Sequence, residues 1–455
     1  MADFLHGVET INKGNAPKNV SEVKTSVIGI VGRAASSGWK DEAPAVNTPI
    51  VIMKAEDVEG KLGTSDEEGT LPYYLKKMYE QFDKQVPLII AVNVGTGGGS
   101  SEPEDTNIYL VDHEGNVITD GEGNPIVIGD TIADATDEVS GGSEIGDTIT
   151  DAMDEVSGIA GNAVRKTGVY ALLKSQIITG YVPRIIVAPG YSQNLEVAQA
   201  MVSVCETLRA RGFVDIDSSL ENDVSLALAT RGNPEKVGNI YDKRISLFWP
   251  KLKSGDKLYP MSAIAAAVRA KTDMDSSMGY HWSISSQKIN GFTGLDIPVT
   301  YSLNISSADS QKLNSRGIVT VKNVGGLKFC GNTNSSFDSE SSGGNTDHEI
   351  FEVTMTTGDV IEESIEYYTE QKIDQPINNV WIDSIVSDVN AFLRKLAARG
   401  AIAGGRCWYD PDENEPTEIM AGHIIFDYDD AATPPADRVT YQRSYNVDYL
   451  AQLGR

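Results

Sequence analysis

The chain of 455 residues is poor in features that mark several protein classes. Its three cysteines, Cys205, Cys330 and Cys407, are odd in number and far apart, which excludes a disulfide framework and fits a reducing compartment. No apolar run approaches the roughly 18 residues of a membrane span. The opening residues lack a basic region and an apolar stretch, so we expect no secretory signal, which argues against a secreted adhesin.

Basic residues are also scarce. Lysine and arginine total 38 against 65 acidic residues, and the formal net charge is -27. Nucleic-acid affinity comes mainly from neutralised phosphates, and anionic membranes attract basic segments, so we expect neither nucleic acid nor a membrane as a partner. The shortage is greatest over residues 85–164, which hold 16 acidic residues and no basic one.

The residue patterns of common active sites are missing as well. The Gly-rich segment 95–100 follows an apolar run, but it contains no Gly-Lys-Ser/Thr, and Ser100 stands where the dinucleotide fingerprint needs its third glycine. A flexible junction is the better interpretation of this segment. There is no Gly-x-Ser-x-Gly elbow, and no histidine has a second ligand at metal-binding spacing. We therefore predict no catalytic, cofactor-binding or metal-binding residue and no cofactor, which disfavours a nucleotide-binding α/β enzyme.

What the sequence does contain is an alternation of strand and helix patterns. The apolar run over residues 26–32 is typical of a strand covered on both faces. Further strands are predicted over 49–53, 87–94, 184–190, 213–216 and 245–249, and helices over 71–82, 162–178, 194–211, 220–230 and 262–270. This alternation predicts right-handed crossovers and a mostly parallel sheet flanked by helices.

An acidic block interrupts the alternation. Residues 107–119 read as a β-hairpin, and the sequence of 128–141 recurs nearly unchanged at 145–158. Both copies place apolar residues on one helical stripe, so we predict two short amphipathic helices on a surface insertion. Two copies are too few for a solenoid. The aspartates have helical spacing rather than that of a calcium loop, which favours a solvated acidic face over weak cation binding.

After residue 276 the pattern changes to strand candidates followed by a long helix. The candidate strands are 281–284, 298–301, 318–321, 423–428 and 439–443, and residues 331–347 read as a loop. Residues 377–399 predict a helix, whose expected inward residues are Val380, Trp381, Ile385, Val389, Phe392 and Leu396. An α+β unit is therefore expected here.

That helix ends in a basic cluster. Arg394, Lys395 and Arg399 lie in its last turns, where cations complement the helix dipole by roughly 0.3–1 kcal/mol each. A basic strip that faces an acidic partner is a compatible second interpretation. At the other end of the chain, residues 8–11 could form a short strand if a sheet were available to them, and otherwise residues 1–20 read as a frayed terminus.

The order of several segments resembles contractile phage tail sheath proteins. Lys166-Thr167-Gly168-Val169-Tyr170 and the segments 26–32, 290–294, 316–320, 330–333 and 392–396 follow in the order of that family. Its most specific match is Pro183-Arg184-Ile185-Ile186-Val187-Ala188-Pro189-Gly190. The resemblance covers about four fifths of the chain, and the acidic block from about residue 99 to 157 departs from it.

The resemblance implies a structural, non-enzymatic subunit that polymerises helically around an inner tail tube and contracts to drive the tube through a host envelope. The implied partners are further copies of the chain, the inner tail tube protein, and baseplate and tail terminator proteins, in a virion tail assembled in the host cytoplasm. A sheath of a phage-derived bacteriocin or injection system is the alternative.

The resemblance also implies terminal arms that add strands to neighbouring subunits. The expected units are an N-terminal arm (1–20), an outer α/β domain (21–98 and 158–275), an acidic insertion (99–157), an inner α+β domain (276–443) and a C-terminal arm (444–455). Candidate arm residues are Val8, Thr10, Ile11, Tyr445, Val447 and Tyr449. The candidates for tube contact are Arg394, Lys395 and Arg399.

Overall fold

The computed structural model describes residues 20–40, 43–83, 85–96, 159–160, 163–164, 167–217, 224–340 and 347–453. Its main feature is an eight-stranded sheet with the order β13-β12-β8-β7-β6-β1-β3-β2. The central strands from β12 to β3 run parallel, whereas β13 and β2 add antiparallel edges. The predicted mostly parallel sheet is confirmed. Its strands are β1 (Ile28–Ala34), β2 (Pro49–Ile52), β3 (Ile89–Thr96), β6 (Ile185–Val187), β7 (Arg211–Asp215), β8 (Ile245–Phe248), β12 (Ile318–Asn323) and β13 (Leu327–Cys330).

Helices cover both faces of this sheet. α1, α2 and α7 pack on one face, and η1, α5, α6 and α8 pack on the other. Their bounds are α1 (Ala55–Leu62), α2 (Leu71–Tyr79), η1 (Gly168–Lys174), α4 (Ser175–Thr179), α5 (Leu195–Leu208), α6 (Val224–Ala229), η2 (Val237–Asn239), α7 (Met261–Met274) and α8 (Asp309–Ser315). Small strands flank them: β4 (Ile159–Ala160), β5 (Ala163–Val164), β9 (Leu252–Ser254), β10 (Lys257–Tyr259) and β11 (Gly294–Leu295).

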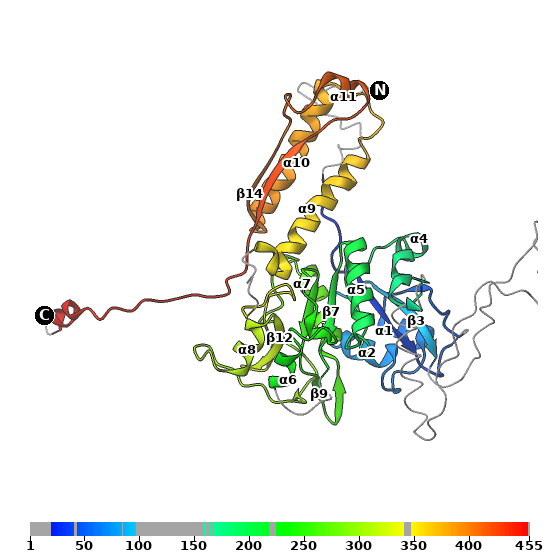
Figure 1. Ribbon diagram of the computed structural model, residues 1–455, viewed down its shortest axis with the longest axis vertical. Coiled ribbons are helices and arrows are strands. Elements are labelled where there is room, and N and C mark those ends of the chain that lie inside the picture. Colours follow the sequence, from blue (N-terminus) through cyan, green and yellow to red (C-terminus); the bar gives the residue numbers. More distant parts are fainter. Residues whose placement is uncertain are drawn as a thin grey trace, which may run out of the picture.

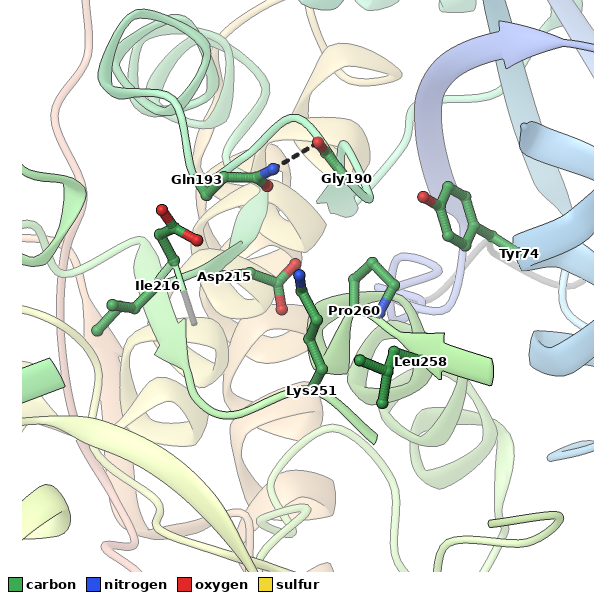
Figure 2. Close-up of a pocket in the computed structure, with 9 residues that line it drawn as sticks. Tyr74, Gly190, Gln193, Asp215, Ile216, Lys251, Leu258 and Pro260 are labelled. Carbon is green, nitrogen blue, oxygen red and sulfur yellow. Dashed lines mark hydrogen bonds between the residues drawn. The ribbon is translucent and has the colours of Figure 1, made fainter. Parts of the chain in front are cut away.

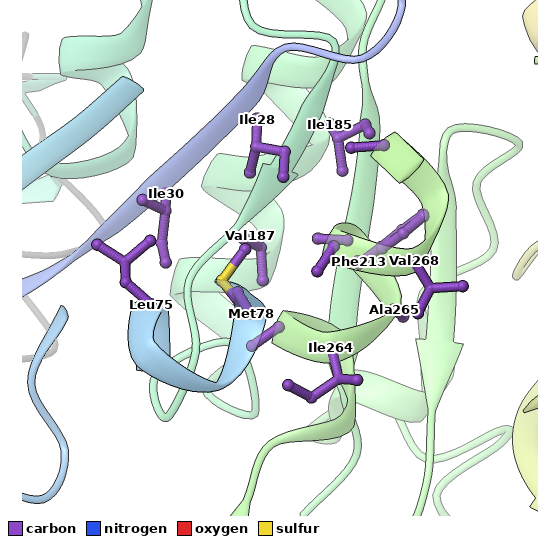
Figure 3. Close-up of a cluster of buried hydrophobic side chains, with 14 of the residues drawn as sticks. Ile28, Ile30, Leu75, Met78, Ile185, Val187, Phe213, Ile264, Ala265 and Val268 are labelled. Carbon is purple, nitrogen blue, oxygen red and sulfur yellow. The ribbon is translucent and has the colours of Figure 1, made fainter. Parts of the chain in front are cut away.

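Successive side chains of each strand enter opposite cores, because side chains alternate along a strand. Ile28 and Ile30 of β1 face Leu75 and Met78 of α2 in the first core (Figure 3). Val31 of β1 belongs to the second core, beneath η1 and α5. The continuous apolar runs of the sequence therefore reflect strands that are buried on both sides.

A second unit projects from this body as a long antenna (Figure 1). It consists of η3 (His348–Ile350), α9 (Glu352–Glu370), α10 (Asn379–Arg399), β14 (Ile402–Trp408), α11 (Pro416–Met420) and β15 (Asp427–Ala432). The strands β14 and β15 form a two-stranded antiparallel sheet. A separate core formed mainly by α9, α10 and β14 holds the unit together, with Val20 of the entering N-terminal segment buried in it.

The structure corrects several expectations from the sequence. The sheet continues past the boundary predicted at residue 276, because β12 pairs with β8, so residues up to Cys330 belong to the body. Residues 281–284, 298–301 and 439–443 form no strand. The strand predicted over 423–428 instead covers Asp427–Ala432. The helix predicted over 377–399 is confirmed as Asn379–Arg399, but Val380 is 78% exposed rather than inward, since it lies in the first turn beyond the core of the antenna.

Candidate assembly surfaces

The β14–β15 hairpin presents unpaired strand edges. Register runs from Ile402 opposite Ala432 to Trp408 opposite Asp427. Among the described residues, each strand pairs with the other alone, so each has a second edge without a strand partner. One face of β14 packs on α10 through Ile402 and Cys407, which fixes the hairpin in place. Unpaired N–H and C=O groups on a fixed edge are a template for an added strand.

The C-terminal segment leaves the antenna as extended chain and ends in the short helix η4 (Val447–Gln452), away from the body (Figure 1). The three candidate arm residues of this segment are exposed: Tyr445 and Tyr449 by 70% each and Val447 by 62%. Tyr441 is 90% exposed. Large apolar side chains on a segment outside its own core mark an interaction surface rather than a packed terminus.

The N-terminal candidates Val8, Thr10 and Ile11 lie outside the described residues. The described chain begins at Val20, which is buried against α9 and α10. The backbone N–H of Val23 donates to Ser364 Oγ of α9 at 3.3 Å. The base of the N-terminal arm is thus fixed to the antenna before the chain enters β1.

The basic end of α10 is divided between two environments. Lys395 Nζ lies 2.9 Å from Glu22 Oε1 and Arg399 Nη1 lies 2.5 Å from Glu22 Oε2. Burial raises the pKa of Glu22, but the hydrogen bond from Lys395 and the charge of Arg399 outweigh it and hold the pKa below its ordinary value. Arg394 is exposed and forms no ion pair with any residue in the described ranges. The structure therefore brings Lys395 and Arg399 together on the N-terminal segment and gives Arg394 no ion-pair partner among the described residues.

A buried ionic network connects the body to the antenna. Arg211 is 1% exposed and contacts Asp273 of α7 at 2.6 Å and Glu352 of α9 at 2.5 Å. Arg269, also fully buried, contacts the same two carboxylates at 2.7 and 3.4 Å. Burial raises the pKa of Asp273, but the charges of Arg211 and Arg269 lower it by more than burial raises it. The pKa of this carboxyl group therefore lies below its ordinary value. Each charge has partners, as a buried ion requires.

The same junction continues along one stripe of α9. Arg244 makes a bidentate pair with Asp359 at 2.6 and 2.9 Å, and Arg209 makes one with Glu366 at 2.6 and 2.8 Å. Arg184 pairs with Glu363. The arginines lie at the beginnings of β6, β7 and β8 or just before them, so α9 crosses the amino-terminal edge of the sheet.

Sequence reasoning missed this junction. A signal was present, because Arg184, Arg211 and Arg244 each stand at the start of an apolar strand. The acidic residues that meet them recur on one face of α9, at positions 352, 359, 363 and 366. Their pairing across the chain could not be read from spacing alone.

A crevice opens where the parallel strands β6 and β7 end, the place at which open α/β sheets bind ligands. The cavity of about 210 Å³ is lined by Tyr74, Gln193, Asp215 and Lys251 among others, and Figure 2 shows Asp215 and Lys251 side by side. Asp215 accepts hydrogen bonds from Ser262 N at 2.9 Å and Ser262 Oγ at 2.5 Å. Burial of Asp215 raises the pKa of its carboxyl group, and the hydrogen bonds from Ser262 offset only part of that rise. The carboxylate thus covers the amino end of α7, where a bound phosphate would sit.

The described residues contain no group of three or more His, Cys, Asp or Glu placed to hold a metal ion. The acidic insertion with its repeat lies outside those residues. No helix in the described ranges is long and apolar enough to cross a membrane.

Two family models match the chain. The phage tail sheath protein central domain matches residues 165–335, and the phage tail sheath C-terminal domain matches residues 351–443. The division between them falls where the sheet of the body has ended and the antenna begins.

Curated relatives and solved structures agree with these matches. The chain is 30% identical to the tail sheath protein of Burkholderia phage BcepMu and 27% identical to that of Escherichia phage P2. The first alignment covers 99% of both chains, and the second covers 100% of this chain and 98% of the relative. In fold the chain is similar to the contracted sheath of the PVC extracellular contractile injection system, with a TM-score of 0.63 at 13% identity over 99% of this chain and 100% of the other. The contracted helical sheath of the anti-feeding prophage gives a TM-score of 0.58 at 15% identity over 98% and 100%.

Proposed function

This chain belongs to the phage tail sheath protein family, and from that premise we propose how its surfaces build the sheath. It is a structural tail sheath subunit that polymerises helically and contracts. Two features together support our proposal best: the hairpin has two edges without a strand partner among the described residues, and the C-terminal segment that leaves the antenna is exposed.

We propose that each terminal arm adds a strand to the hairpin of a neighbouring subunit. The C-terminal arm, residues 444–455 with Tyr445, Val447 and Tyr449, takes one edge, and its short helix η4 becomes extended on pairing. The N-terminal arm with Val8, Thr10 and Ile11 takes the other edge. Main-chain hydrogen bonds supply the affinity, and alternate side chains enter pockets. Because such a contact joins different surfaces of successive copies, it does not close and extends into a helical tube.

Deletion of the arms tests this exchange. A chain without residues 1–19, which keeps the buried Val20, and a chain without residues 444–455 are each expected to remain folded by circular dichroism and to form no tubes by negative-stain microscopy. A matched control replaces residues 444–455 with a Gly/Ser segment of equal length, which keeps the chain length but removes the side chains. Tubes at wild-type yield from either deletion would refute the exchange.

The second part of the proposal concerns the inner tube. Arg394, Lys395 and Arg399 face the inner tail tube protein in the extended sheath. Lys395 and Arg399 share Glu22, whereas Arg394 has no ion-pair partner in the described part of the chain. Exposed ion pairs are worth about 0–1 kcal/mol each and are screened by salt. Weak contacts repeated over many subunits would hold the extended state and release together.

Charge reversal at Arg394 tests the tube contact without disturbing Glu22. Arg394→Glu is expected to reduce assembly on the inner tube and to leave tube-free polysheath at wild-type yield. Glu22→Gln is the matched control, since it disrupts the ion pairs at the base of the arm and leaves Arg394 in place. Equal assembly of wild type and Arg394→Glu on the tube would place this helix end elsewhere.

The remaining partners follow from the same role. Baseplate and tail terminator proteins cap the two ends of the polymer, assembly takes place in the host cytoplasm, and contraction releases energy stored in the extended lattice, so no catalysis is required.

The sheath of a phage-derived bacteriocin or injection system is the second candidate, favoured by the fold similarity to two such sheaths. The acidic block of residues 99–157, which lies outside the described residues, is expected to deter clumping of tubes through like charge. Its removal is expected to leave tubes intact, and loss of tubes would show that the block is structural.

A further inference from the structure

We propose that the body carries its own head-to-tail contact between copies of this chain, in which Leu303 and Ile305 of one subunit enter an apolar groove beside β2 of the next. The inference rests on the polymerising role given above. It concerns the body, whereas the arm exchange concerns the antenna and the termini.

The groove lies along the edge of β2 that has no strand partner in the described ranges. Its cavity of about 530 Å³ has apolar lining residues from β2 and α4, namely Pro49, Ile50, Val51 and Ile178, and Lys61 and Thr179 line it as well. Ile178 is 50% exposed, and its neighbour Ile177 on α4 is 91% exposed. Two adjacent, solvent-exposed isoleucines beside an apolar groove form a contiguous apolar patch, unlike a single apolar residue on a polar surface.

The edge of β2 is blocked against an added strand. Lys61 Nζ donates to the outward carbonyl oxygen of Val51 at 2.8 Å. Pro49, at the start of the strand, has no N–H to offer. A capped carbonyl and a missing donor prevent a continuous ladder. The groove therefore suits inserted side chains instead of a partner strand.

The complementary feature is the loop before α8. Leu303 is 86% exposed and Ile305 is 55% exposed, the two large apolar side chains at the tip of this loop. Burial of an exposed aliphatic side chain of this size is favourable by about 1.5–3 kcal/mol. Their position in the chain gives them no core to join.

Hydrogen bonds fix the loop in shape. Asp309 accepts from both the backbone N–H and the hydroxyl of Thr300, at 3.2 and 2.7 Å. Ser302 Oγ accepts from the N–H of Ile305 at 3.2 Å, and Gln311 Nε2 donates to the carbonyl oxygen of Ser302 at 3.0 Å. A loop that is already ordered pays little entropy when it binds. Leu303 and Ile305 are thus held out as a preformed knob.

Groove and knob lie at opposite ends of the same sheet. β2 is one edge of the sheet, and α8 packs on β12, next to the other edge. In Figure 1, α8 and β12 lie on one side of the body and α4 and β3 on the other. Two different patches at opposite ends make a heterologous contact, which propagates from copy to copy instead of closing as a dimer.

Crosslinking of assembled tubes tests the contact. The native cysteines Cys205, Cys330 and Cys407 are buried, so the background with a short bismaleimide is low. Tubes from a mixture of Leu303→Cys chains and Ile178→Cys chains are expected to give crosslinked dimers and nothing larger. Tubes from the double variant L303C/I178C are expected to give a ladder of higher multimers. Either single variant alone should give monomers.

The control uses Ile373→Cys chains in place of the Ile178→Cys chains. Ile373 lies in the antenna and is 62% exposed, and its cysteine variant should not crosslink to Leu303→Cys chains. As an independent measurement, L303S/I305S should raise the critical concentration for tube formation by about tenfold or more, whereas Ile373→Ser should not. Tubes that form normally in L303S/I305S and give no mixed dimers would overturn this contact and leave the arm exchange standing. Failure of the wild-type chain to form tubes would instead overturn the proposed function, and this contact with it.

Discussion

Arg211 contributes to the junction through charge rather than size, because its guanidinium contacts two carboxylates whose side chains are only 1% and 10% exposed. Arg211→Met would leave Asp273 and Glu352 with one arginine between them, which costs about 3–5 kcal/mol in buried pairs. Arg209→Met, two residues away, removes a 32% exposed arginine whose pairs are worth about 0–1 kcal/mol. Urea titration followed by circular dichroism compares the two free energies of unfolding. Equal losses would show that the buried network adds nothing beyond surface pairing.

Asp273 gives the junction a defined pH dependence. Its folded pKa lies below the ordinary value of 3.8, so its contribution to stability is complete above that value and is lost as pH falls through the folded pKa. Asp273→Asn is expected to lower stability at pH 7 and to flatten the loss of stability on acidification from about pH 5 to pH 3. The exposed Asp66→Asn is the control. An unchanged slope in D273N would contradict the assignment.

At the level of single residues, sequence reasoning reached the contacts that depend on local spacing and missed those that depend on folding. The inward positions Ile385, Val389, Phe392 and Leu396 of α10 are confirmed by their burial, since helical period alone determines the face. The partner of Lys395 is Glu22, which lies 373 residues away in the chain. No periodicity encodes such a pairing.

At the level of elements, α9 shows why propensity can mislead. Its first turns contain Val353, Thr354, Thr356 and Thr357, residues of low helix propensity, and no helix is predicted there from the sequence. In the structure, Thr356 and Thr357 donate to carbonyl oxygens four residues earlier and are buried. Packing against the sheet overrides local preference. The reverse holds for residues 298–301, which have strand-forming side chains but no neighbouring strand to pair with.

The strength of the ionic junction between α9 and the sheet can be measured by a double-mutant cycle. Arg244 and Asp359 are each 13% exposed and form two short hydrogen bonds, so Arg244→Met, Asp359→Asn and the double variant should give a coupling energy of about 1–3 kcal/mol. The pair Lys243–Glu349, at 44% and 33% exposure, is the control and should give about 0–1 kcal/mol. Coupling at Arg244 no larger than at Lys243 would mean that this pair holds α9 no more strongly than a surface ion pair does.

At the level of the whole molecule, the division into body, antenna and arms determines what can move. The body has two apolar cores and the antenna has its own, with an ionic seam between them. The described C-terminal arm has no core and only exposed apolar side chains. We therefore expect body and antenna to move together during contraction, with the extended arms as tethers that keep neighbours joined while the lattice changes.

The sequence predicted this architecture unevenly. Alternating patterns predicted the parallel sheet and its helices, because buried strands and amphipathic helices are local features. The end of the body was misplaced, since β12 follows a long irregular stretch and joins the sheet only through a nonlocal pairing with β8. The terminal arms were predicted only from the resemblance to a family, because a segment without a core of its own has no residue pattern that identifies its partner.

Arm exchange is tested most directly by the structure of the assembled tube at a resolution that traces the main chain. The account predicts that residues 444–453 of one subunit lie beside β14 or β15 of another, with N–H to carbonyl distances of about 2.9 Å along the shared edge. The N-terminal residues 8–11 should occupy the remaining edge. Arms that fold back on their own subunit, or hairpin edges left bare in the tube, would contradict it.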